Sequence, residues 1–245
     1  MVTHFSSRCP PMPILLALDA SSSACSAALL QRCEGSDDVL VSRFALTPRD
    51  HTRRLLPMVD QVLAEAGLAP SELDAVAFGR GPGSFTGLRI AAGLAQGLAY
   101  GLDRPLLGVS TLEALALGAH RRHALSHVIT ALDARMGEIY VASWRCHDGV
   151  IEALSQEAVM PPERLQLPEG HSGCDWVGVG SGWALREAMS DAIRTAVRQG
   201  DTALEPAAEE MVLLAARAYA DGERHAAHDV QPIYLRDQVA WKKSR

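Results

Sequence analysis

Residues 79–90, with the sequence GRGPGSFTGLRI, decide the fold of this chain. The glycine-rich part ends an apolar run, and Ser84 is a favoured capping residue for a helix that we predict from about Phe85 to Tyr100. This helix is apolar on nearly every side, with Arg89 and Gln96 as its strongly polar residues. A helix of that kind is buried on two sides. One side can pack on a sheet, and the other needs a second domain or a partner chain.

The composition describes a globular protein without a basic excess. The chain has 245 residues, 48% of them hydrophobic, and a formal net charge of −6. The length suits one large domain or two small ones, and the charge argues against binding nucleic acid alone. We expect a cytoplasmic protein without a signal peptide or a membrane span. An odd number of cysteines without a CxxC pair predicts neither a disulfide framework nor a zinc site: Cys9, Cys25, Cys33, Cys146 and Cys174.

The first half predicts three strands followed by alternating helices and strands. The order βββαβα, with right-handed crossovers, implies a mixed sheet with flanking helices and an α/β fold. The predicted strands are 14–18, 25–31, 39–46, 75–78 and 106–109, and the predicted helices are 51–67, 85–100 and 110–119.

In the second half, the residues that mark the ends of helices and strands are less distinct. A hairpin is expected across residues 134–137, and the amphipathic pattern of residues 207–219 predicts a helix with Pro206 near its start and Gly222 past its end. The predicted strands are 128–133, 138–144 and 176–179, and the predicted helices are 163–167, 184–197 and 207–219.

These elements suggest two lobes. We expect a loose N-terminal extension at 1–12, a first lobe at 13–108 and a second lobe at 109–206. The C-terminal helix, 207–222, should join the first lobe, and residues 223–245 should form a tail. No element is predicted for the tail.

A candidate nucleotide or anion site combines two turns. Asp19 ends the first strand, and the small-residue turn after it includes Ser21. Gly83 and Ser84 lie at the start of the apolar helix, where backbone N–H groups attract anions. Two other interpretations stay open: Asp19 could cap its own turn, and the glycines could serve close backbone packing.

Other polar clusters have simpler explanations. His120, His123 and His127 lie near a predicted helix end, where metal binding is the less favoured interpretation. Asp133 and Glu138 flank the hairpin turn and are either charged turn residues or a carboxylate pair. The chain has no G-x-S-x-G motif, so a serine nucleophile is not indicated.

Six strings in this order resemble the TsaB (YeaZ) family: ILLALDASSSACSAAL, HTRRLLP, FGRGPGSFTGLRIAAGLAQGLA, PLLGVSTLEALA, ALDARMGEIYVA and YLRDQVAWKK. The resemblance implies a two-lobed actin/hexokinase-like (ASKHA) fold. It also implies a subunit that supports TsaD, together with the ATPase TsaE, in forming N6-threonylcarbamoyladenosine (t6A) at position 37 of tRNAs that read ANN codons.

The resemblance further implies that this chain is not the catalyst. In TsaD, two histidines hold the metal, and they lie on the helix after the strand that corresponds to residues 106–109 of this chain. Thr111 and Leu115 occupy those positions here. Leucine cannot bind a metal, and threonine is a poor ligand. No catalytic residue, metal or cofactor is expected for the chain alone, so ATP or ADP and metal belong to the complex with TsaD and TsaE. Two alternatives remain: a glycoprotease-like metallopeptidase and an ATP-dependent small-molecule kinase.

The apolar helix also predicts a partner surface. A stripe of mostly small residues should face a helix of TsaD, or of a second copy when TsaD is absent, while Ile90, Leu94 and Leu98 pack on the sheet. tRNA would be contacted indirectly through the complex, and a direct contact by Lys242, Lys243 and Arg245 stays open. The predicted interface residues are Leu55, Val59, Val62, Leu88, Ala92, Ala95 and Ala99.

Overall fold

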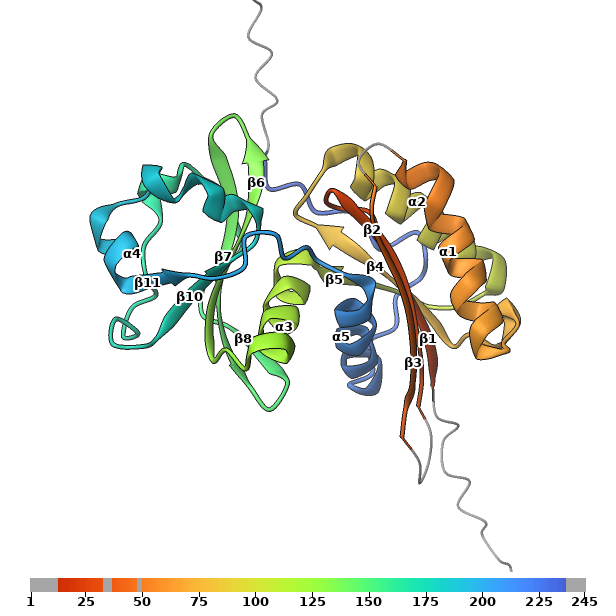
Figure 1. The fold of residues 1–245 in the computed structure, drawn as a ribbon. Helices are drawn as coiled ribbons and strands as arrows, with labels where there is room; N and C mark the ends of the chain where they lie inside the picture. The colour runs from red at the N-terminus through yellow and green to blue at the C-terminus, as the bar shows by residue number, and fades with distance from the viewer. Residues whose placement is uncertain (1–12, 33–36, 48–49, 237–245) are drawn as a thin grey trace, which may run out of the picture.

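The computed structural model describes residues 13–32, 37–47 and 50–236, and in these ranges the chain forms two β-sheets (Figure 1). The first sheet has the strand order β3-β2-β1-β4-β5. Strand β1 pairs antiparallel with β2 and parallel with β4, so the sheet is mixed, as the sequence predicts. Its strands are β1 (Ile14–Asp19), β2 (Ala24–Gln31), β3 (Val39–Leu46), β4 (Ala75–Gly81) and β5 (Leu106–Ser110).

Helices cover both faces of the first sheet. On one face lie α1 (His51–Ala66) and α2 (Phe85–Leu102), whose buried residues share a core with Leu16, Leu18 and Phe78 of the sheet. On the other face lies α5 (Ala208–Ala220), which packs on alternate residues of the same strands. Because side chains alternate across a strand, the apolar residues 15–18 of β1 supply both cores.

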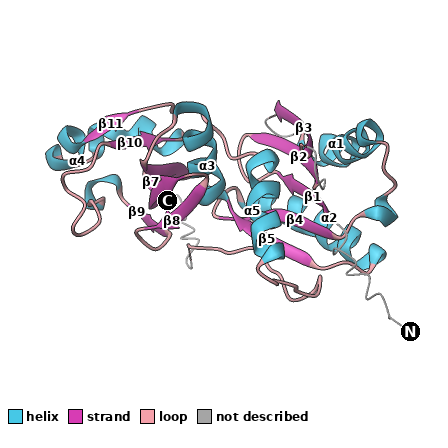
Figure 2. Ribbon diagram, turned by 90° about the horizontal axis from the view of Figure 1, so that it is seen from below, coloured by secondary structure: helices cyan, strands magenta, loops and turns pink. Residues whose placement is uncertain are grey.

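Helix α3 (Thr111–His123) joins the two halves of the molecule. Figures 1 and 2 show α3 and α5 between the two sheets. One side of α3 contributes Ala114 and Leu117 to the core under α5. The other side contributes Leu112 and Leu115 to the core of the second sheet. A helix that is buried nearly all round therefore connects both sheets.

The second sheet has the order β11-β10-β6-β7-β8, with β9 paired to β7. Its centre is the predicted hairpin of β6 and β7, and α3 covers one face. Its strands are β6 (His127–Arg135), β7 (Glu138–His147), β8 (Val150–Ala153), β9 (Ala158–Met160), β10 (Trp176–Val179) and β11 (Val197–Gln199).

The structure corrects two helices predicted in this half. Residues 184–197 do not form one helix, because the chain is extended at Met189, whose side chain is buried in the core, and Ser190 then caps a new helix. Residues 163–167 form no α-helix, since the chain makes a 3₁₀ turn at Pro162–Arg164 and is extended again at Leu165. The observed elements are η3 (Ser181–Ala188) and α4 (Asp191–Ala196), besides the short turns η1 (Pro70–Glu72) and η2 (Pro162–Arg164).

Residues 223–236, for which no element was predicted, return to the first sheet. The N–H of Leu106 donates to the carbonyl of His225 (3.0 Å), and the N–H of Ile233 donates to the carbonyl of Arg80 (2.7 Å). On α2, Gln96 donates to the carbonyl of Val230 at 2.9 Å. We call residues 226–236 the C-terminal segment. The predicted extension at 1–12 and the basic residues at 242, 243 and 245 lie outside the described residues.

Among the described residues no helix is both long and apolar enough to cross a membrane.

Candidate functional site

The glycine loop packs directly on the turn after β1. The N–H of Ser84 donates to the carbonyl of Ser21 at 2.7 Å. A Cβ on Gly83 would lie 2.4 Å from that carbonyl oxygen, and a Cβ on Gly87 would lie 1.8 Å from the carbonyl oxygen of Ala20. The Ser84 hydroxyl also accepts the N–H of Gly87, which caps α2 as predicted. The structure therefore brings the two predicted turns together, and close backbone packing is one reason for the glycines.

Asp19 lies beneath this contact rather than on the surface. Its side chain is fully buried, and its Oδ2 accepts the N–H (3.2 Å) and the hydroxyl (3.0 Å) of Ser21. The other oxygen, Oδ1, has no hydrogen-bond partner among the described residues. Burial raises the pKa of Asp19 to about 7, although the hydrogen bonds from Ser21 oppose the shift. Asp19 thus holds the turn in place, which is the capping alternative.

A cavity of about 1040 Å³ opens above these turns, between the two halves of the molecule. Ser21, Gly83 and Ser84 line it, and Asp19 does not. The C-terminal segment and the β6–β7 hairpin form the opposite walls, and the sequence did not predict them as part of the site. The residues of these walls are Leu132, Asp133, Ala134, Arg135, Met136, Tyr140, Ile233, Tyr234, Leu235 and Arg236.

Two ion pairs lie at the walls of the cavity, and Glu205, which also lines it, accepts a hydrogen bond from Ser23. Arg135 binds Asp133 (3.1 Å), and Arg236 binds Glu138. Asp133 and Glu138 therefore belong to separate ion pairs, which supports the interpretation as turn residues over a catalytic carboxylate pair. The cavity also receives the N-terminal end of α2, whose partial positive charge favours an anion such as a phosphate.

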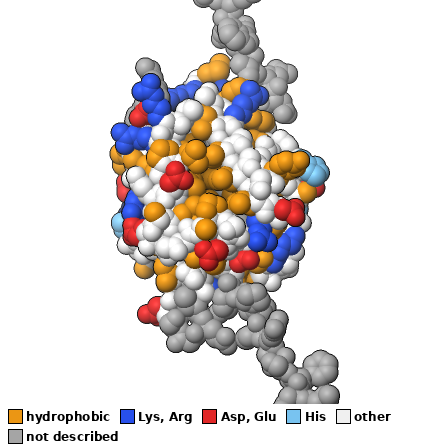
Figure 3. Space-filling model, turned by 90° about the vertical axis from the view of Figure 1, so that its right-hand side faces the viewer, with side chains coloured by type: hydrophobic (Ala, Val, Ile, Leu, Met, Phe, Trp, Pro, Cys, Tyr) orange, Lys and Arg blue, Asp and Glu red, His pale blue; other side chains and the backbone are white. Residues whose placement is uncertain are grey.

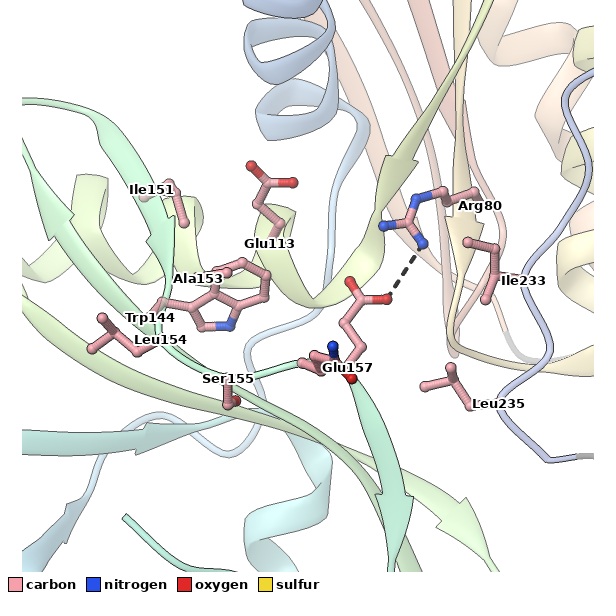
Figure 4. Close-up of a pocket in the computed structure, with 11 residues that line it drawn as sticks. Arg80, Glu113, Trp144, Ile151, Ala153, Leu154, Ser155, Glu157, Ile233 and Leu235 are labelled. Carbon is pink, nitrogen blue, oxygen red and sulfur yellow. Dashed lines mark hydrogen bonds and ion pairs between the residues drawn. The ribbon is translucent and has the colours of Figure 1, made fainter. Parts of the chain in front are cut away.

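A second cavity, of about 730 Å³, lies on another side of the junction between the halves (Figure 4). Arg80 from the end of β4 reaches across to Glu157, which precedes β9, with 3.3 Å between their charged atoms. Ser110 donates its hydroxyl proton to the same carboxylate. Burial raises the pKa of Glu113, which also lines this cavity, and the charge of Arg80 opposes the shift. These contacts tie the edge of the first sheet to the second.

The two positions compared with the metal ligands of TsaD face into the protein. Thr111 is fully buried and donates its hydroxyl proton to the carbonyl of Pro82. Leu115 is 1% exposed and packs in the core of the second sheet. Both side chains therefore have packing roles.

The three histidines near the end of α3 are separated in the structure. His120 contacts the carbonyl of Leu125 through Nδ1 (2.8 Å) and accepts the N–H of Gly149 through Nε2 (3.3 Å). Its two ring nitrogens are thus used to hold the adjoining turns. His127 contacts His171 instead, at 6.1 Å between ring centroids.

The predicted partner surface was wrong in one respect: its residues face the core of this chain. All seven are between 0 and 4% exposed. Ala92, Ala95 and Ala99 pack on the first sheet because small side chains let α2 lie close to it. Ile90, Leu94 and Leu98, which were expected on the sheet, are half-buried and pack at the margin of the same core. The residues concerned are Leu55, Val59, Val62, Leu88, Ala92, Ala95 and Ala99.

The exposed side of α2 carries a different pattern, which we call the glycine stripe: Gly93, Gly97 and Gly101. A Cβ placed on any of them would meet no atom within 4 Å. Figure 3 shows apolar side chains gathered on this face of the molecule, with charged residues around them. Leu56 of α1 is 45% exposed on its helix. The four-residue spacing of these glycines is present in the sequence. The alanines on the same helix are also small, so the alanine stripe and not the glycines was predicted as the exposed surface.

Arg89 and Gln96, the polar residues of α2, hold the C-terminal segment. Arg89 donates to the hydroxyl of Tyr234 at 3.3 Å and lies over the ring of Phe85. The helix thus has a sheet side, a side covered by the C-terminal segment and an open side with the glycine stripe. Two sides of this apolar helix are therefore covered by residues of the same chain.

Two mixed sheets joined by α3, with a cavity between the halves, define a two-lobed α/β protein. The family model described as "TsaD: tRNA N6-adenosine threonylcarbamoyltransferase" matches residues 45–244. The solved structure described as YeaZ from Pseudomonas aeruginosa is 45% identical and covers 91% of this chain, and this chain covers all of it, with a TM-score of 0.82.

Two curated relatives carry the same description, tRNA threonylcarbamoyladenosine biosynthesis protein TsaB. The one from Escherichia coli (strain K12) is 42% identical over 230 residues, which are 94% of this chain and 97% of the relative. The one from Haemophilus influenzae is 39% identical over 244 residues, 94% of this chain and 96% of the relative. The chain therefore belongs to the TsaB (YeaZ) family of tRNA threonylcarbamoyladenosine biosynthesis proteins.

Proposed function

We propose that this chain is a non-catalytic subunit of the cytoplasmic system that forms t6A at position 37 of tRNAs reading ANN codons. It acts by binding TsaD and supporting it together with TsaE, and it pairs with a second copy of itself when TsaD is absent. tRNA is contacted through the complex.

The observation that carries this proposal is the glycine stripe on the open side of α2. Glycines spaced by four residues let the backbone of a second helix approach closely, so that many weak contacts form over a small area. The half-buried Leu94 and Leu98 and the exposed Leu56 supply apolar area beside the stripe. The proposed surface thus lies on α1 and α2, as the sequence predicts, but it consists of the exposed side of these helices and not of the seven buried residues that were predicted.

The buried positions of Thr111 and Leu115 support a non-catalytic role. A metal in the place used by TsaD would need two ligand side chains there, and these two are packed against Pro82 and the second core. We propose that ATP or ADP and the catalytic metal belong to the complex. Ser21, Gly83 and Ser84 would then contact a nucleotide phosphate in the cavity, with Asp19 holding the turn from below.

The test measures assembly with TsaD from the same cell. The chain is co-expressed with TsaD, and the molar mass of the complex is determined by light scattering after size-exclusion chromatography. In Gly97→Arg the large side chain blocks a second helix without entering the core, since position 97 is open. We expect TsaD binding to weaken by at least about 100-fold, as for a residue at the centre of an interface.

Two variants serve as controls. Gly97→Ala adds a small side chain and should stabilise α2 by up to about 1 kcal/mol. This variant shows whether the loss of the glycine alone, without a large side chain, changes TsaD binding. Ala220→Arg adds the same charge at the exposed end of α5, on the other face of the sheet. If Gly97→Arg binds TsaD as well as Ala220→Arg does, the proposed surface is wrong.

A further inference from the structure

Three metal-ligating side chains meet at the edge of the second sheet, away from the cavity. The ligand atoms of His127, His171 and Cys174 all lie within 4.8 Å of one another. His127 begins β6, and the other two come from the turns before β10. Strand β6 carries the cavity residues at its opposite end, near Arg135, which is roughly 25 Å away at 3.3 Å per residue. The cluster is therefore a separate place in the molecule.

The backbone around the cluster is held by contacts that do not involve the three ligand atoms. Trp176 stands opposite His127 in the parallel pairing of β10 with β6. Its indole N–H donates to the carbonyl of His171 at 2.8 Å. The N–H of Cys174 donates to the same carbonyl at 3.3 Å, which closes a turn between the two ligands. The chain thus directs both side chains toward the start of β6.

The chemistry of the cluster suits a borderline metal ion. Burial, the nearby His171 and the charge of Arg145 lower the pKa of His127, against the opposing charge of Asp175. A metal ion binds an imidazole in its neutral form, through the free electron pair of a ring nitrogen. Two imidazoles and one thiolate are typical ligands of Zn²⁺, and calcium and magnesium prefer oxygen.

The spacing of the ligand atoms also fits. His171 Nδ1 and Cys174 Sγ are 4.0 Å apart, which is long for a hydrogen bond between them. Two ligands of a tetrahedral zinc ion lie about 3.5 Å apart, given bonds of about 2.1 and 2.3 Å. A small inward rotation of the side chains therefore brings them to a zinc ion, while the half-buried setting leaves a fourth position for water.

We propose that His127, His171 and Cys174 bind one Zn²⁺ ion, which fastens the segment before β10 to the start of β6. The thiol of Cys174 releases its proton when the ion binds. This site does not depend on the TsaD partnership, and it differs in place from the Thr111 and Leu115 positions. The sequence did not predict it, because the ligands become neighbours only through the pairing of β6 with β10.

The test uses the purified full-length chain after treatment with a chelator. Titration with Zn²⁺ in a calorimeter should show one ion per chain, and Zn²⁺ should raise the melting temperature. Co²⁺ in its place should give the near-ultraviolet absorption of a cobalt–thiolate bond. The double variant His171→Ala/Cys174→Ala should lose this absorption and bind Zn²⁺ at least about 100-fold more weakly, beyond the loss typical for groups that merely orient ligands.

Matched variants remove a histidine and other cysteines elsewhere. His123→Ala, at the exposed end of α3, should bind Zn²⁺ as the unchanged chain does. Cys146→Ala removes a buried thiol whose pKa burial raises to about 12, and it should also keep the site. A third control replaces Cys9 and Cys33 by serine and should keep the cobalt absorption. If the double variant binds Zn²⁺ as tightly as His123→Ala does, the proposed site is refuted.

Discussion

A Cβ on residue 79 would lie 2.1 Å from Oδ1 of Asp19, so Gly79 leaves the room that this buried carboxyl group occupies. The two residues lie on β1 and β4, which run side by side at the centre of the first sheet. The turn that Asp19 holds, and with it one wall of the cavity, thus depends on a glycine in the next strand.

Gly79→Ala should destabilise the protein by about 2–3 kcal/mol, as overpacking of a buried site does. The measurement is urea unfolding followed by fluorescence. In a chain that already carries Asp19→Ala, the same change should cost much less, because the nearest clashing atom is gone. Gly93→Ala is the control: its Cβ would meet nothing within 4 Å, so it should stabilise α2 slightly. Equal costs of Gly79→Ala in both backgrounds would show that the two residues are not coupled.

The buried Asp19 should make stability depend on pH between about 4 and 7. Its pKa is about 7 in the folded protein and 3.8 without burial, so folding favours the protonated form. The stabilising effect of the proton is complete below about pH 4 and lost as the pH rises through 7. The chain should therefore lose up to about 4 kcal/mol relative to Asp19→Asn over this range. Unfolding of both proteins in urea at pH 4.5, 6 and 8 checks this, and a constant difference would contradict it.

Arg121 should matter more at neutral than at acidic pH. Its guanidinium on α3 lies 2.9 Å from Glu209 and 3.1 Å from Glu210 of α5. Burial and the neighbouring Glu209 raise the pKa of Glu210, and Arg121 opposes this shift. Arg121→Met leaves the nearly buried Glu210 without its charged partner and should cost about 1–2 kcal/mol at pH 8. Thermal unfolding should show this cost shrinking toward pH 4, where Glu210 is protonated.

The exposed neighbour Arg122 supplies the control for that experiment. Arg122→Met removes an identical charge from the same helix without removing the ion pair. A cost at pH 8 as large as that of Arg121→Met would mean that net charge, and not the contact with Glu210, accounts for the effect.

The first sheet and its helices could be predicted because the residues that begin and end these elements lie next to them in the sequence. Gly67 ends α1 in the left-handed conformation, and Ser84 caps α2, so both helices begin and end close to the predicted residues. Strand β3 has the predicted bounds, Val39–Leu46. The second half was harder, because the short strands β9 and β11 depend on pairing with strands that are not their neighbours across a tight turn. Strand β8 is only four residues long and pairs with the end of β7 across the turn at Asp148 and Gly149, a signal that was not used in predicting the strands.

The site was predictable only where it is made by neighbours in sequence. Ser21, Gly83 and Ser84 lie in turns that the glycines indicate, and the structure brings them to one cavity. The wall formed by Tyr234 and Arg236 follows from the path of the C-terminal segment, which no local pattern reveals. On α2 both the alanine and the leucine stripes are apolar, so hydrophobicity could not tell which one packs on the sheet. The close approach of α2 to the sheet selected the alanines.

The return of the C-terminal segment sets an order for the assembly of the molecule during synthesis. Domains generally fold as units, with the N-terminal one first, as the chain is made. Here Ile233 donates one hydrogen bond to the carbonyl of Arg80 in the first sheet, and Arg236 forms an ion pair with Glu138 in the second. A nascent chain that still lacks these residues leaves the cavity without one wall. The cavity therefore takes its described shape only after residues 233–236 have been made and have joined both halves of the molecule.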